Sequence, residues 1–79
     1  MKVKIKGIRK IAITGEFIKL DSLLKLADIA STGGMAKILI QNGDVHVNGE
    51  ICTERGRKIV PGDLVRYNHD MIAVTTHDG

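Results

Sequence analysis

The sequence is poor in aromatic residues and in cysteine. It has no tryptophan, one phenylalanine (Phe17) and one tyrosine (Tyr67), so we expect a core of leucine, isoleucine and valine. Base stacking of the kind that grips single-stranded nucleic acids is therefore largely unavailable. The single cysteine, Cys52, cannot form an internal disulfide, and no Cys/His cluster has zinc-site spacing. We expect a reducing, cytoplasmic location, no metal and no cofactor.

Long hydrophobic runs are also missing. The first residues alternate lysines with Val3 and Ile5, without the continuous apolar stretch of a signal peptide or a membrane span. Apolar residues make up 43% of the 79 positions and charged residues 27%, which is typical of a globular protein. This length predicts one domain over residues 1–79. No serine, cysteine or carboxylate has an identifiable acid or base partner, which argues against an enzyme.

The charge is modestly basic and unevenly distributed. A net charge of +3 favours an anionic partner without naming one. Arg55, Arg57 and Lys58 crowd into one short loop, and the planar fork of arginine suits phosphate. The alternative is a solvated loop that Glu54 partly neutralises. Five further basic residues precede the first acid, Glu16: Lys2, Lys4, Lys6, Arg9 and Lys10.

Two helices are predicted by apolar residues that recur at helical spacing. The first covers residues 20–30, with Asp21 as its N-cap. The second begins at Thr32 or Gly33 and ends before Gly43. Helices commonly end with a glycine in the left-handed conformation, and Gly43 lies at that position.

Strands are predicted on both sides of the helices. Residues 2–6 and 11–13 fit strands joined by a hairpin near Gly7, although a basic arm that orders only on binding would have the same composition. Asn48-Gly49 is a strong hairpin signal. The fold class is therefore α+β, with two helices packed on a small antiparallel sheet. The strands expected after the helices cover residues 45–47, 50–53, 58–60, 64–67 and 71–75.

Short motifs occur in a fixed order along residues 20–65: Leu20-Asp21, Ala36, Lys37, Leu39, Ile40, Gly43, Val45-His46-Val47-Asn48-Gly49 and Pro61-Gly62-Asp63. With these motifs the stretch resembles the S-four (alpha-L) RNA-binding domain, which occurs in a small-subunit ribosomal protein, some pseudouridine synthases and a tyrosyl-tRNA synthetase. The similarity to short, stand-alone bacterial members (YaaA/YbcJ-like) is closer, and it runs from the first helix through the Arg-Gly-Arg-Lys loop to the last strand. Many members have a serine and an arginine where this chain has Thr32 and Gly33, so one phosphate contact is missing.

The resemblance implies binding of structured RNA, read by shape and backbone, with ribosomal RNA in ribosome assembly or translation as the expected target. Free amides at Gly33 and Gly34 would attract a phosphate, unless these glycines only make a tight turn between the helices. Lys37 and Gln41 share a helix face that could contact the RNA. The alternative is that this face is simply solvated. The candidate RNA-binding residues are Gly33, Gly34, Lys37, Gln41, Arg55, Arg57, Lys58 and, more weakly, Lys25.

Other hypotheses stay open from the sequence. The chain could be a protein-interaction adaptor that recruits a partner through its sheet or basic N-terminal strand, with incidental nucleic-acid affinity. DNA is a possible ligand as well, and a minimal enzyme would need a catalytic group that the sequence does not reveal. We expect a monomer that associates with a ribosomal particle and not with membranes.

Overall fold

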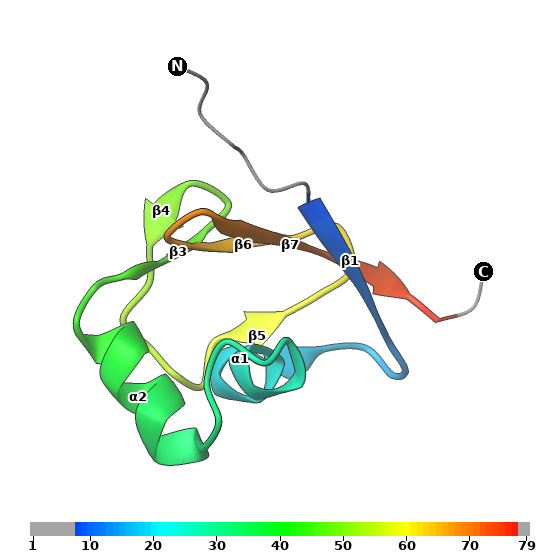
Figure 1. Cartoon of the computed structure of the whole chain (residues 1–79). Helices are drawn as coiled ribbons and strands as arrows, with labels where there is room; N and C mark the ends of the chain where they lie inside the picture. The colour runs from blue at the N-terminus through cyan, green and yellow to red at the C-terminus, as the bar shows by residue number, and fades with distance from the viewer. Residues whose placement is uncertain (1–7, 78–79) are drawn as a thin grey trace.

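The computed structural model describes residues 8–77, in which two helices lie on one side of a five-stranded sheet (Figure 1). The α+β class is thereby confirmed. The predicted hairpin near Gly7 and the lysines before it lie outside the described residues. In chain order the elements are β1 (Ile8–Ile13), β2 (Ile18–Lys19), α1 (Leu20–Leu26), α2 (Gly33–Gln41), β3 (Val45–Val47), β4 (Glu50–Ile51), β5 (Lys58–Ile59), β6 (Leu64–Tyr67) and β7 (Asp70–Thr76).

The main sheet has the strand order β1-β7-β6-β3-β4 and is mixed. Strands β3, β4, β6 and β7 pair with antiparallel neighbours, as the sequence predicts, but β1 runs parallel to β7. The chain leaves β1 through both helices and returns to it only with its last strand. β5 does not join this sheet, because it pairs with β2 in a separate two-stranded sheet.

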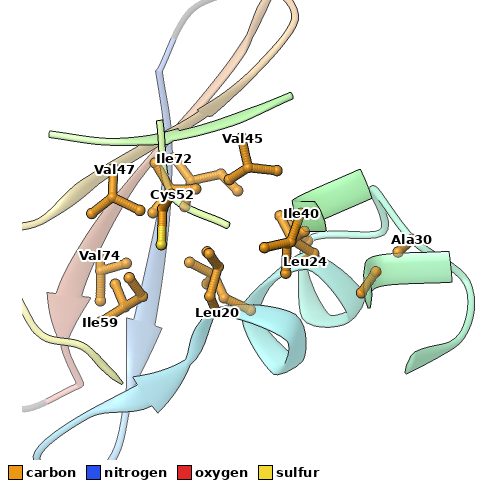
Figure 2. Packing of buried hydrophobic residues seen from close by; sticks show 14 of the residues in the cluster. Leu20, Leu24, Ala30, Ile40, Val45, Val47, Cys52, Ile59, Ile72 and Val74 are labelled. Carbon is orange, nitrogen blue, oxygen red and sulfur yellow. The ribbon is translucent and has the colours of Figure 1, made fainter. Parts of the chain in front are cut away.

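The core between the sheet and the helices is aliphatic, as the composition predicts (Figure 2). Leu20 and Leu24 from α1 and Ile40 from α2 have no solvent exposure and face Val45 and Ile72 of the sheet. Each such side chain contributes about 1.5–3 kcal/mol when it leaves water. This packing fixes both helices, and therefore their ends, against the sheet.

The predicted Asn48-Gly49 hairpin turn is confirmed, and its side-chain hydrogen bonds join it to a second turn at Asp63. Asn48 and Gly49 both have positive φ, at 52° and 88°, as a tight hairpin requires. The Asn48 side chain donates to an Asp63 carboxylate oxygen (3.0 Å) and accepts from the Leu64 N–H (2.9 Å). The other Asp63 oxygen accepts from the Val60 N–H (2.9 Å), so Asp63 is a turn residue.

The first helix begins at Leu20 as predicted, but its predicted C-terminal limit and N-cap are wrong. The helix stops at Leu26, where Asp28 adopts φ 65° and the Ile29 N–H donates back to the Leu24 carbonyl (2.9 Å). Ala30 is nevertheless buried, which explains why the apolar pattern continues beyond the helix. Asp21 is not the N-cap either: Lys19 holds that position, with no side-chain hydrogen bond.

Arg9 has a structural partner within the fold. Its guanidinium Nη1 donates to the Ala27 carbonyl (2.9 Å), at the C-terminal cap of α1. A cation there satisfies a free carbonyl and complements the negative end of the helix dipole. Arg9 therefore joins β1 to α1. No helix within residues 8–77 is long and apolar enough to cross a membrane.

Candidate nucleic-acid interface

The N-terminus of α1 is closed by the loop that precedes β5. The Leu20 N–H donates to the Arg57 carbonyl (2.9 Å), and the Asp21 N–H donates to the Arg55 carbonyl (3.1 Å). The first N–H groups of a helix need such acceptors because no residue of the helix supplies them. The Arg57 N–H in turn donates to the Glu54 carbonyl (3.1 Å), which tightens the loop. The loop backbone is thus held against α1.

The side chains of this loop remain exposed. Arg55, Arg57 and Lys58 all face solvent, and within residues 8–77 no ion pair joins the two arginines to a carboxylate, Glu54 included. The sequence alternative of a loop neutralised by Glu54 therefore finds no support in the geometry. The charges of Arg55 and Arg57 are available to an external anion.

Lys19 adds a cation that the sequence reasoning missed. It lies directly opposite Lys58 in the β2–β5 pair, and both side chains are exposed. Like charges that face each other across strands destabilise a sheet, so an anion placed between them would relieve the repulsion. The pairing of two short strands distant in sequence gave no local signal. We call Lys19, Arg55, Arg57 and Lys58 the basic surface.

The N-terminus of α2 is open, in contrast to that of α1. Thr32 is the N-cap, and its hydroxyl accepts only the Met35 N–H (3.0 Å). Within the described part of the chain, no hydrogen bond uses the N–H groups of Gly33 and Gly34, and the first turn of the helix carries no acidic residue. Free amides and the positive end of the helix dipole together attract anions.

The two glycines at this end have no internal reason to be glycine. A Cβ at Gly33 would meet nothing within 4 Å, and one at Gly34 would meet only the Thr32 hydroxyl, at 3.9 Å. Neither residue has positive φ, so the tight-turn alternative does not explain them. Glycine in a helix costs about 0.5–1 kcal/mol relative to alanine. It does keep the backbone N–H groups accessible to a ligand.

The other predicted residues lie along the helices. Lys37 is exposed one turn beyond Gly33, and Gln41 is exposed one turn further, at the end of α2. Lys25 lies in the last turn of α1, where a cation complements the helix dipole, so its position has a structural explanation.

The predicted residues form two groups and not one pocket. The basic surface lies at the N-terminal end of α1, whereas Gly33 and Gly34 follow its C-terminal end after the connection of residues 27–32. A helix of seven residues is about 10 Å long. The two helices lie next to each other below the sheet (Figure 1), so the two groups flank α1.

No metal site accompanies these groups in residues 8–77, where no three His, Cys, Asp or Glu side chains gather. His46 lies opposite Ile51 in the β3–β4 pair and is half-buried. Cys52 is buried, and its thiol lies 3.7 Å from the Glu54 carbonyl. Neither residue belongs to a ligand set.

The chain belongs to the S4 domain family, because the family's model matches residues 11–75. The match extends beyond the predicted stretch of residues 20–65 and takes in half of β1 and most of β7. The resemblance seen in the sequence is thereby confirmed.

Two relatives resemble the chain closely. One is the probable ribosome maturation protein RlbA of Bacillus subtilis (strain 168), which is 47% identical over 55 residues, covering 70% of this chain and 78% of RlbA. The other is the candidate RNA-binding protein YbcJ of Escherichia coli (strain K12), 40% identical over 50 residues, covering 63% of this chain and 71% of YbcJ.

Proposed function

We propose that this protein binds structured RNA, with the basic surface and the open N-terminus of α2 each holding a backbone phosphate. The observation that carries the proposal is the pair of exposed anion-attracting groups at opposite ends of α1, one of guanidinium and ammonium groups and one of backbone amides. A single small anion does not span a helix of about 10 Å, but a polyanion does.

RNA is the polyanion that the relatives favour, since the name of YbcJ describes RNA binding. Exposed aromatic residues for gripping several successive bases are missing, so shape and backbone recognition of a folded RNA fits better than recognition of a single strand. The role is binding, not catalysis. Nothing in the two groups pairs a nucleophile with a base.

We place the RNA in the ribosome, as ribosomal RNA bound during maturation of the particle. The support is the name of RlbA, a probable ribosome maturation protein, together with the 47% identity to it. Lys37 extends the α2 group along its helix, and Gln41 contributes a neutral donor one turn further.

The test is fluorescence anisotropy with ribosomal RNA fragments and a matched DNA duplex over a salt series. The Arg55→Ala/Arg57→Ala double variant should bind more weakly, with a slope of log K against log salt shallower by about one to two units. A matched control is Lys10→Ala/Arg66→Ala. It removes the same charge from exposed residues that alternate with core residues and so point away from the helices. Equal losses in the two double variants would contradict the proposal.

The adaptor hypothesis has one observation in its favour. The sheet face opposite the helices leaves Ile8 (54%), Ile51 (61%) and Leu64 (39%) exposed, more aliphatic surface than a solvated sheet face needs. This hypothesis predicts RNA affinity that does not depend on Arg55 and Arg57. The same titration therefore separates the two functions.

A further inference from the structure

Phe17 stands apart from the core and beside the basic surface. Its side chain is 40% exposed, and it is not part of the buried aliphatic cluster. The Lys58 ammonium lies over its ring, 4.9 Å from the centroid. This cation–π contact ties the aromatic ring to one of the four cations that the proposed function assigns to phosphate.

The ring also lines an open hollow of about 230 Å³. Leu26, which also lines the hollow, is 59% exposed, so a large part of this surface is apolar and in contact with water. The residues around the hollow are Ala12, Ile13, Thr14, Phe17, Ile18 and Leu26.

The hollow is continuous with the basic surface through the small sheet. Phe17 immediately precedes β2, and Lys19 at the end of that strand pairs with Lys58 of β5. An RNA backbone held at these lysines would bring its bases within reach of the ring. The chemistry that matches an aromatic ring, aliphatic walls and an adjacent cation is a nucleobase with its phosphate.

We propose that this hollow receives one unpaired nucleobase of the bound RNA, stacked on the ring face of Phe17 that Lys58 does not cover. The inference rests on the proposed function, and it specifies which kind of structured RNA the protein prefers. A base inside a duplex is stacked on both sides and cannot enter, so the preferred RNA is a helix interrupted by a bulged or looped-out nucleotide.

The test compares three RNA hairpins that differ at one position: a single-nucleotide bulge, the same bulge without its base, and a fully paired stem. Wild-type protein should bind the bulged hairpin about 5- to 100-fold more tightly than the other two, which is the contribution of one stacked base. Phe17→Leu keeps an apolar side chain but removes the ring, so it should bind all three hairpins alike.

Two further variants keep the test independent of folding defects. Phe17→Trp keeps an aromatic ring and should retain the preference for the bulge. Because the chain has no natural tryptophan, its fluorescence reports on this site alone and should be quenched by the bulged hairpin. Ile51→Ala removes an exposed aliphatic side chain from β4 and should leave the preference unchanged.

Failure of this inference is distinguishable from failure of RNA binding. Salt-sensitive binding that depends on Arg55 and Arg57 but does not distinguish the hairpins overturns the nucleobase site and leaves the proposed function standing. Equal affinity for bulges with and without a base also overturns it, because the RNA is then chosen for its flexibility. A wild-type dimer that Phe17→Leu converts to a monomer would show that a second copy fills the hollow, and overturns it as well.

Discussion

The two helices of this domain begin in opposite ways. At α1, the carbonyls of Arg55 and Arg57 accept the first two N–H groups, and Asp21 places a negative charge in the first turn. At α2, Thr32 satisfies one N–H group, while those of Gly33 and Gly34 stay unused and the first turn carries no acid. The requirement that the first N–H groups of a helix find acceptors is met within the fold at α1, whereas at α2 two of these N–H groups have no acceptor among residues 8–77.

The difference shows how one small fold leaves two kinds of anion-attracting group exposed. Closing α1 with the loop backbone turns the loop side chains outward, so cations gather there. Leaving α2 open exposes backbone amides instead. No ion pair within residues 8–77 neutralises either group.

The largest expected effect on stability comes from truncating a buried side chain at the N-terminus of α1. Leu20 is the first residue of α1 and has no solvent exposure, so Leu20→Ala should lower the free energy of unfolding by about 2–5 kcal/mol. Leu26→Ala makes the same change in the same helix at a side chain that is 59% exposed, and its effect should lie within about 0.5 kcal/mol. Denaturant titration measures both. Similar losses would show that the closed end does not depend on the buried leucine.

The next largest effect comes from removing a free N–H group at the N-terminus of α2. Gly33→Pro removes one free N–H group at the first position of α2, where proline suits the helix, and the preceding Thr32 is extended, as proline requires. Stability should be unchanged or higher by about 0.4–1 kcal/mol. RNA affinity should fall by about 1.5–3 kcal/mol, the contribution of a hydrogen bond to a charged group. Unchanged affinity in anisotropy titrations would remove this amide from the interface.

The smallest effect concerns the other ends of the helices. The residue after the C-cap of α2 is Gly43, with φ 82°, whereas the residue after the C-cap of α1 is Asp28, with φ 65°, a left-handed conformation that is unfavourable for residues with a Cβ. Asp28→Gly should raise the melting temperature by a few degrees, corresponding to about 0.5–1 kcal/mol. Asp44→Gly, at an exposed aspartate beyond the end of α2 without positive φ, is the control and should not stabilise.

Local signals in the sequence predicted much of the fold. The limits of α2, the left-handed Gly43 and the Asn48-Gly49 hairpin each depend on residues close together in the chain, and all three are confirmed. The family resemblance also predicted the S4 domain correctly. The RNA-binding roles of Gly33, Gly34, Lys37, Gln41, Arg55, Arg57, Lys58 and Lys25 stay predictions.

Features that depend on distant pairing were not predictable in this way. The carbonyls that close α1, the pairing of Lys19 with Lys58 and the parallel alignment of β1 with β7 all join segments far apart in sequence. Periodicity also misled at Ala30, because a residue can be buried at helical spacing without being helical. In each case the missing information is which distant segments of the chain contact each other in the fold.

The loop that closes α1 also has a consequence for synthesis of the protein. A helix of seven residues is too short to be stable alone, and the acceptors for its first two N–H groups belong to Arg55 and Arg57. At about 5–20 residues per second, these arginines leave the ribosome seconds after α1 does. A nascent chain therefore has no assembled basic surface until residues 55–58 have emerged.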